Sequence, residues 1–211
     1  MSAATEGPGP HAGSARAEGS GPLVGILALQ GGFEAHERVL KRLGAVTRQV
    51  RVPADLEGLD ALVLPGGEST VMTLGVEREG LKQPLCDLAA AGTPILGTCA
   101  GMIMLDRAHL GILDVLAERN AFGRQLHSFE VSFEVDGVED GPVHAIFIRA
   151  PWIAEHGPDV TVLAEVDGHP VAVRQGKIVA LSFHPELTGE DRLHRFFLSQ
   201  AGFGDTGKKA P

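Results

Sequence analysis

The sequence predicts a three-layer α/β protein, in which helices cover both faces of a mostly parallel central sheet and an antiparallel extension follows. In the first half of the chain, short apolar runs alternate with segments of helical spacing, a pattern typical of strand–helix–strand units. In the second half, apolar runs follow one another through the turn signals Asp167-Gly168 and Gln175-Gly176, which favour antiparallel hairpins.

The first half begins with a buried strand and a helix. Residues 23–29 are continuously apolar, as expected for a strand covered on both faces. Apolar residues then recur at helical spacing from Phe33 to Leu43, and Gly44 is suited to end that helix. Ser69 is a candidate N-cap for a later helix. The other elements predicted in this half are strands at 46–52 and 60–64, a helix at 83–91, a strand from residue 94 and a helix after residue 101.

The second half predicts the antiparallel extension. Residues 129–135 alternate between apolar and polar side chains, as in a half-buried strand. Four more strands are predicted, at 143–148, 161–166, 170–173 and 177–183, and a closing helix at 190–200.

Composition indicates one acidic globular domain. The chain has 211 residues, of which 44% are hydrophobic and 21% charged, so it can bury a core of ordinary size. Its 18 basic and 27 acidic residues give a net charge of −9, which disfavours a nucleic-acid partner.

The two ends of the chain differ from the rest. Residues 1–22 are mostly Ala, Gly, Ser and Pro without an apolar run, so we expect a disordered tail rather than a secretion signal. Residues 204–211 are interpreted as a second disordered tail, which leaves a folded domain at 23–203. No apolar stretch approaches the roughly 20 residues that span a bilayer. With two cysteines and no signal, we expect free thiols and a cytoplasmic location.

Cys99 is the candidate nucleophile. It lies in the segment GTCAG, at 97–101, between a predicted buried strand and a helix. This G-x-nucleophile-x-G pattern is typical of a sharp turn on which larger neighbouring side chains would clash. The following helix N-terminus stabilises a thiolate, and the N–H of Ala100 is placed to donate to an oxyanion. An inert buried cysteine is the alternative that this segment alone leaves open. Cys86, in an amphipathic helix, is interpreted as core.

A Gly-Gly turn follows another predicted strand, in the segment PGGES at 65–69. Because the carboxyl ends of neighbouring parallel strands meet in one crevice, the N–H of Gly67 could join that of Ala100 in a two-donor oxyanion hole. A plain glycine-rich turn is the simpler interpretation of this segment by itself. The segment does not fit a phosphate-binding loop, because the G-x-x-x-x-G-K-[ST] pattern is missing.

His184 is the candidate general base. It follows an apolar strand, and Glu186, two residues further on, can bind one ring nitrogen and leave the other for the thiol. One histidine and one glutamate make an incomplete metal site, so we expect no metal and no cofactor. His11 lies in the predicted tail. Most of the remaining histidines are interpreted as surface or helix-face residues: His36, His109, His127, His144, His156, His169 and His194.

These motifs together resemble the triad-type (class I) glutamine amidotransferases. The resemblance rests on GTCAG at 97–101, PGGEST at 65–70 and FHPE at 183–186. Three further segments are similar to one branch, the glutaminase subunits of pyridoxal 5′-phosphate synthase: GILALQGGFEAHERVLKRLGA from residue 25, ERNAFGRQLHSFE at 118–130 and FIRAP at 147–151. The resemblance extends from about residue 23 to the last helix. It implies the three-layer, flavodoxin-like fold of class I glutamine amidotransferases, with an antiparallel extension.

The resemblance also implies roles for individual residues. Cys99, His184 and Glu186 would form the catalytic triad. The residues implied at the glutamine site are Gly67, Glu68, Ser69, Arg119, Ile148 and Arg149. Taken alone, the two arginines are more simply interpreted as solvated surface residues, although arginine is a good partner for the carboxylate of a free amino acid.

The implied reaction is hydrolysis of L-glutamine to glutamate and ammonia through a γ-glutamyl thioester. The ammonia would pass to a separate synthase subunit, which forms pyridoxal 5′-phosphate from a pentose phosphate and a triose phosphate. The resemblance implies a complex of twelve copies of each subunit, active when docked. Rearrangement of the Gly-Gly turn on docking would explain that dependence, and residues 30–37 are a candidate docking segment.

Two other classes of function remain open on the sequence alone. A different cysteine hydrolase or a stress-protein relative of this fold would keep GTCAG without needing FHPE. A non-catalytic scaffold could keep the fold, although the intact trio of Cys99, His184 and Glu186 argues against it.

Overall fold

The structure is a computed structural model, and it describes residues 21–119 and 128–203. Residues 1–20 and 204–211, where the tails are predicted, lie outside the described ranges, as does His127. Pro22, at the end of the predicted N-terminal tail, is described, and its carbonyl accepts a hydrogen bond of 2.8 Å from the N–H of Val46.

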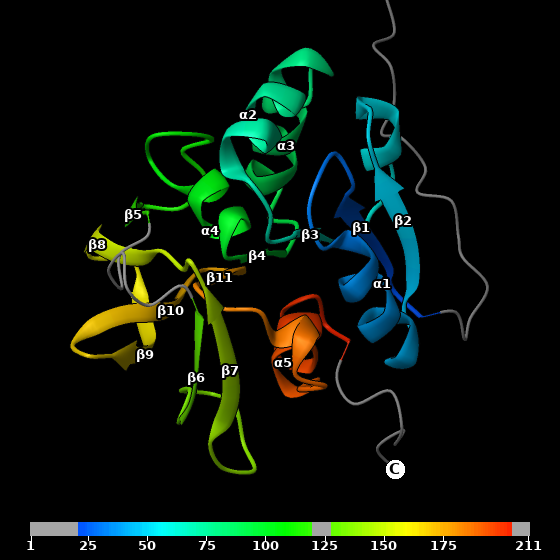
Figure 1. Ribbon diagram of the computed structural model, residues 1–211. Helices are drawn as coiled ribbons and strands as arrows, with labels where there is room; N and C mark the ends of the chain where they lie inside the picture. Colours follow the sequence, from blue (N-terminus) through cyan, green and yellow to red (C-terminus); the bar gives the residue numbers. More distant parts are fainter. Residues whose placement is uncertain (1–20, 120–127, 204–211) are drawn as a thin grey trace, which may run out of the picture.

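A seven-stranded sheet forms the centre of the molecule (Figure 1), and its strand order is β2-β1-β3-β4-β11-β10-β9. The first five strands in this order are parallel, and β10 and β9 are antiparallel to their neighbours. The bounds are β1 Leu23–Leu27, β2 Val46–Val50, β3 Ala61–Leu64, β4 Ile95–Thr98, β9 Thr161–Val166, β10 His169–Gln175 and β11 Ile178–Leu181. The predicted parallel sheet and its antiparallel extension are confirmed.

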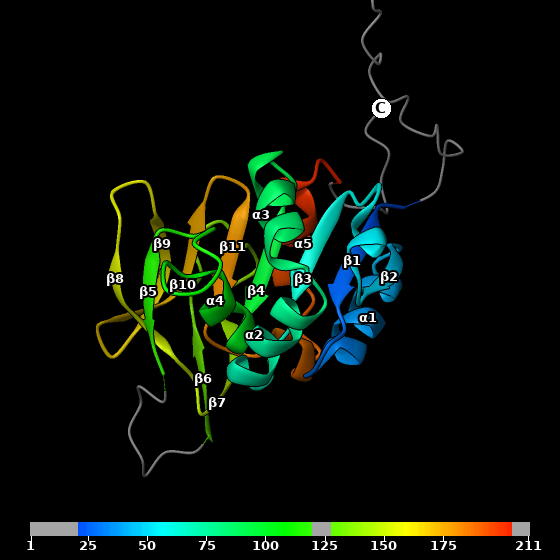
Figure 2. The same cartoon turned by 90° about the horizontal axis from the view of Figure 1, so that it is seen from above.

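Helices cover both faces of this sheet (Figure 2). α1 (Phe33–Arg42) and α5 (Arg192–Gln200) pack into one buried cluster, which also contains Ala61 and Val63 of β3. α2 (Ser69–Arg78), α3 (Lys82–Ala90) and α4 (Ala100–Leu105) pack into a second cluster with Leu62 and Leu64. Successive residues of β3 therefore point to opposite layers, which is why its sequence is continuously apolar.

Two small antiparallel ribbons complete the fold. β6 (Ser128–Phe133) pairs with β7 (Val143–Ile148), and Phe147 of β7 joins the α1–α5 cluster. β5 (Val115–Glu118) pairs with β8 (Trp152–His156), and their apolar residues join the other cluster. The sequence did not predict β5 and β8, whereas it predicted β6 and β7 at nearly the observed positions.

Two short 3₁₀ turns lie between these elements, η1 (Pro53–Leu56) and η2 (Pro185–Leu187). Asp167-Gly168 joins β9 to β10, as predicted. The turn after β10 is one residue later than predicted, at Gly176-Lys177, because Gln175 ends β10 and pairs with Ile178. The predicted N-cap Ser69 is wrong by one residue. Ser69 is the first helical residue of α2, and the Glu68 carboxylate accepts hydrogen bonds from the N–H groups of Thr70 and Val71 instead. The Glu68 side chain, which is longer than that of Ser69, binds the free N–H groups at the start of α2, and its negative charge is favourable at the positive end of the helix dipole.

Candidate active site

Cys99 lies on a sharp turn between β4 and α4. Its φ is 49° and its ψ is −108°, a conformation that a side chain rarely adopts. The backbone N–H of Cys99 donates a 2.7 Å hydrogen bond to the carbonyl of Leu181 at the end of β11. A Cβ on Gly101 would lie 1.9 Å from the carbonyl oxygen of Leu64, so only glycine lets the turn pack this closely against β3. The structure therefore has the strand–turn–helix geometry that the GTCAG pattern predicted.

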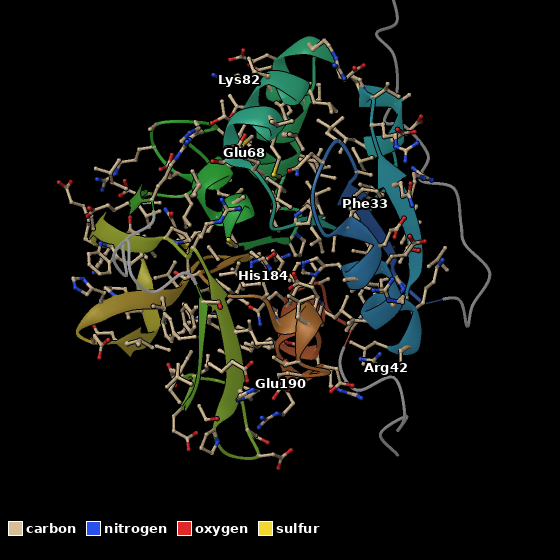
Figure 3. The ribbon with its side chains drawn as sticks, in the orientation of Figure 1. Phe33, Arg42, Glu68, Lys82, His184 and Glu190 are labelled. Atoms are coloured by element: carbon tan, nitrogen blue, oxygen red, sulfur yellow. The ribbon has the colours of Figure 1, made fainter. Side chains whose placement is uncertain are left out.

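His184 follows β11, which pairs in parallel with β4 in the register Leu181 to Thr98. The ends of both strands therefore deliver His184 and Cys99 to the same edge of the sheet. Figure 3 shows His184 in the middle of the molecule, near α1 and α5. The N–H of His184 donates to the carbonyl of Ile146 in β7, at 3.0 Å, which fixes the backbone on the other side.

Glu186 binds His184 as predicted. Its Oε1 lies 2.7 Å from Nδ1 of His184, and its side chain is 2% exposed. Burial works against protonation of His184, but hydrogen bonds with Cys99 and Glu186 and the charge of Glu186 outweigh it and raise the pKa of His184 to about 10. Burial likewise opposes ionisation of Glu186, and its contacts with His36 and His184 outweigh that and lower its pKa. The pair is therefore arranged to stabilise an imidazolium beside the Cys99 sulfur.

The Gly-Gly turn lies directly against the side chains of His184 and Cys99. A Cβ on Gly66 would lie 2.3 Å from Cε1 of His184 and 3.3 Å from Cβ of Cys99, so any larger residue would displace the base. The segment that follows β1 holds this turn. The N–H of Gly32 donates to the carbonyl of Gly66 at 2.9 Å, and Oε1 of Gln30 accepts from the N–H of Glu68 at 2.7 Å.

A cavity of about 160 Å³ opens beside Cys99. Its size is below the roughly 300–1,000 Å³ of pockets for drug-sized ligands, and suits a small metabolite. It is lined by Gly67, Glu68, Ser69, Cys99, Ala100, Ile103, Arg119, Ile148, Arg149 and Pro151. The structure thus brings together every residue predicted for oxyanion and glutamine binding. Ile103 and Pro151 were not predicted as site residues, although Pro151 belongs to the quoted FIRAP segment.

The polar side of the cavity is exposed to solvent. Arg119 donates to the hydroxyl of Thr70 at 3.3 Å, and its charge adds to the backbone N–H groups that lower the pKa of Glu68. Arg149, at the end of β7, has a φ of 44°. Acidic and basic side chains therefore line the same opening of the cavity, and an arrangement of this kind can pair with both an ammonium and a carboxylate group.

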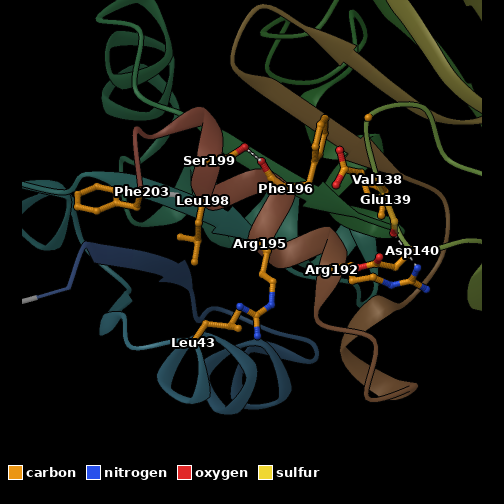
Figure 4. Close-up of a pocket in the computed structure, with 11 residues that line it drawn as sticks. Leu43, Val138, Glu139, Asp140, Arg192, Arg195, Phe196, Leu198, Ser199 and Phe203 are labelled. Carbon is orange, nitrogen blue, oxygen red and sulfur yellow. Dashed lines mark hydrogen bonds between the residues drawn. The ribbon is translucent and has the colours of Figure 1, made fainter. Parts of the chain in front are cut away.

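A second, larger cavity lies elsewhere and shares no residue with this site (Figure 4). It has about 260 Å³, between α5 and the loop that joins β6 to β7. Its lining includes Arg192 and Phe196 from α5 and Glu139 and Asp140 from the loop. It is therefore separate from the cavity beside Cys99.

The other expectations concern metals, membranes and cysteines. Among residues 21–119 and 128–203, no three His, Cys, Asp or Glu side chains group as metal ligands would. Over the same ranges, no helix has the length and apolarity needed to cross a bilayer. Cys86, interpreted from the sequence as a core residue, is partly buried and packs against the core. Both cysteines are free thiols.

Two histidines interpreted as surface or helix-face residues are instead wholly buried beside the triad. His36 of α1 and His194 of α5 are both 0% exposed, and Nε2 of His36 lies 3.4 Å from Oε2 of Glu186. No local sequence signal marks them, because 158 positions separate the two residues.

Comparison with known proteins identifies the family. The model of the SNO glutamine amidotransferase family matches residues 26–202. A protein of Mycolicibacterium vanbaalenii is 50% identical over 192 residues, which cover 85% of this chain and 98% of that protein. A protein of Clavibacter michiganensis subsp. michiganensis is 52% identical over 195 residues, covering 88% and 93%. Both relatives are named pyridoxal 5′-phosphate synthase subunit PdxT.

Solved structures agree with the sequence comparison. A crystal structure of a glutamine amidotransferase superposes with a TM-score of 0.80 at 47% identity, covering 85% of this chain and 99% of the other. A glutamine amidotransferase from Thermotoga maritima, 16% identical with a TM-score of 0.58 over 87% of this chain and 84% of its own, shares the fold. The expected class of fold is confirmed, and the chain belongs to the SNO glutamine amidotransferase family.

Proposed function

We propose that this chain is the glutaminase subunit of a pyridoxal 5′-phosphate synthase, with Cys99, His184 and Glu186 as its catalytic triad. The observation that carries the proposal is that Cys99 lines a cavity of about 160 Å³ and contacts His184, whose ring is bound by Glu186 at 2.7 Å. Relatives about 50% identical over most of their length carry the name of that subunit.

The first half of the reaction forms a thioester. His184 takes the thiol proton of Cys99, and the sulfur attacks the side-chain carboxamide carbon of L-glutamine. The N–H groups of Ala100 and Gly67 donate to the oxyanion of the tetrahedral intermediate. The carbon–nitrogen bond then breaks as His184 passes its proton to the leaving nitrogen, so ammonia leaves and the γ-glutamyl group stays on sulfur.

The second half returns the enzyme to its starting state. His184 takes a proton from a water molecule, whose oxygen attacks the thioester carbon. The carbon–sulfur bond breaks, glutamate leaves and the sulfur recovers its proton. Glu186 orients His184 throughout and stabilises the imidazolium, as the carboxylate does in other triads. Glu68, Ser69, Arg119, Ile148 and Arg149 bind the substrate beside Cys99.

Ammonia becomes a poor nucleophile when it is protonated in water, so a shielded path to a second active site follows from the chemistry. We place that second site on a separate synthase subunit, in an assembly of twelve copies of each, located in the cytoplasm. The two free cysteines suit a reducing compartment. The hydrogen bonds that join Gln30 to the N–H of Glu68 and Gly32 to the carbonyl of Gly66 support residues 30–37 as the segment through which docking reaches the oxyanion hole.

The test is glutamate release from glutamine by the purified chain, with and without the synthase subunit. Cys99→Ala should lower release by roughly 10⁴-fold or more, because the nucleophile is gone, while partner binding remains. Cys86→Ala is the matched control and should keep full activity. Glutaminase activity of Cys99→Ala equal to that of the parent would exclude the triad, and equal parent rates with and without the synthase would exclude activation by docking.

A further inference from the structure

A row of buried polar side chains continues behind the triad. Nε2 of His36 lies 3.4 Å from Oε2 of Glu186 and 3.1 Å from the hydroxyl of Thr98, the residue before the nucleophile. On the other side of the ring, Nδ1 of His36 lies 2.9 Å from Nε2 of His194. The row therefore joins α1 and α5 to both strand ends of the active site.

The second oxygen of Glu186 needs this row. Oε1 is bound by His184, whereas Oε2 is buried and has no hydrogen-bond partner among the described residues. The ring nitrogen of His36 is the polar group that faces it. A buried carboxylate oxygen without a donor is costly, so even a long N–H contact matters there.

The hydrogen-bond network assigns the tautomers of both histidines. If His194 donates its Nε2–H to Nδ1 of His36, then Nε2 of His36 carries a hydrogen toward Glu186 and Thr98. The remaining nitrogen, Nδ1 of His194, is then a bare acceptor, which agrees with its lack of a partner among the described residues. In the opposite arrangement His194 would bury an unpaired N–H, and a lone pair of His36 would face the carboxylate.

Both histidines are neutral in this arrangement. Burial lowers the pKa of His36, with Glu186 opposing and His184 adding to the effect. Burial lowers the pKa of His194 to about 3, and the charges that act on it are His36, Glu186 and Arg42. The charged or titratable groups that act on Glu186 itself are His36 and His184. A neutral N–H donor facing Glu186 leaves the negative charge of the triad in place.

We propose that His36 is a positioning residue for glutamine hydrolysis, which directs its Nε2–H at Oε2 of Glu186, and that His194 fixes the tautomer of His36. The same N–H also faces the hydroxyl of Thr98, the residue before Cys99. The His36 ring therefore fixes the position of the Glu186 carboxylate relative to the start of the turn that carries Cys99. The kinetic part of this inference rests on the proposed glutaminase function.

The kinetic test compares His36→Leu with the parent, both bound to the synthase subunit. We expect kcat to fall roughly 10- to 100-fold, the range found when a partner that orients a functional group is removed, with KM within about twofold. Without the His36 donor, Glu186 protonates more easily, so the acid limb of the kcat–pH profile should move to higher pH. His36→Gln keeps an N–H donor near the position of Nε2. It should restore most of the parent kcat and most of the parent position of the acid limb.

Two further variants separate positioning from packing. Leu40 lies one turn further along α1, is 0% exposed and packs in the apolar α1–α5 cluster, so Leu40→Ala should destabilise the fold without moving the acid limb. His194→Phe keeps a ring but removes the donor to His36, and should give a smaller shift than His36→Leu. An unmoved acid limb and a kcat within twofold of the parent in folded His36→Leu would overturn the proposal.

A measurement on the unmodified chain needs neither glutamine nor folding of a variant. Nitrogen-15 spectra of histidine-labelled protein report which ring nitrogen carries hydrogen. We expect His36 and His194 to be neutral Nε2–H tautomers from pH 6 to 8. An Nδ1–H tautomer of His36 overturns the proposal, whereas a parent chain without glutaminase activity but with the expected tautomers overturns only the proposed function.

Discussion

Cys99, His184 and Glu186 are each no more than 9% exposed, whereas Glu68, Arg119 and Arg149, around the same cavity, are exposed to solvent. The triad side is fixed by strand ends, buried hydrogen bonds and close glycine contacts. The other side of the cavity, proposed to bind glutamine, consists of side chains on turns and strand ends that are exposed to solvent. The difference indicates that the chemistry is assembled by folding, and that recognition is completed when substrate arrives.

The comparison predicts that changes on the buried side alter kcat and changes on the exposed side alter KM. Glu186→Gln is the strongest test, because it keeps size but removes the charge that holds the His184 imidazolium. We expect kcat to fall roughly 10³- to 10⁴-fold with little change in KM, as for carboxylate-to-amide changes in other triads. A loss confined to KM, measured by glutamate release, would contradict the assignment of Glu186.

Gly66→Ala tests the close packing on the buried side. Its Cβ would meet the His184 ring at 2.3 Å, so the base must move, and such a displacement costs roughly 10²-fold in kcat. Gly75→Ala is the matched control, because its Cβ would meet the side chain of Leu29 no closer than 3.1 Å, at the flexible Cδ1. Similar activities of the two variants would show that the Gly-Gly turn can move to accommodate the added Cβ without displacing His184.

Arg149→Ala and Arg119→Ala test the exposed side. Loss of a charged hydrogen bond to the substrate carboxylate should raise KM roughly 10- to 100-fold and leave kcat within about threefold. Arg107→Ala is the control, because Arg107 pairs with Asp114 and Glu155 away from the cavity. If kcat falls instead, these arginines act on the triad and the division between the two sides is wrong.

Stability against pH gives the smallest expected effect. The pKa of His184 in the folded chain, about 10, lies above the ordinary 6.5, so its contribution to stability is complete below pH 6.5 and is lost as the pH rises toward 10. The lowered pKa of Glu186 acts in the opposite direction, and its contribution is lost as the pH falls below about 4.5. In urea unfolding, Glu186→Gln should flatten the alkaline decline. Parallel curves for parent and variant would contradict a charged pair.

The sequence predicted those parts of the site that depend on local patterns. Cys99 and His184 each follow a short apolar strand, and parallel strands bring their carboxyl ends to one edge, so these residues could be placed together without coordinates. Glycine patterns at 66–67 and 97–101 were informative because close packing against Leu64 and His184 tolerates nothing larger.

Features that depend on long-range contacts were not predicted. The short strands β5 and β8 are not joined by a tight turn, since 34 positions separate Glu118 from its pairing partner Trp152. Both Ser69 and Glu68 are able to cap a helix, and only the path of the backbone decides between them. His36 meets His194 because α1 and α5 pack on the same face of the sheet, which no local pattern specifies.

The position of β11 in the sheet has a consequence for how the protein is made. This strand is the last of the central sheet along the chain, yet it lies between β4 and β10, and it brings in both His184 and the carbonyl that holds the N–H of Cys99. A growing chain on the ribosome therefore presents Cys99 as an ordinary thiol until the segment that carries β11 emerges and inserts. A chain truncated before β11 would lack His184 and this hydrogen bond, and we expect it to release no ammonia from glutamine.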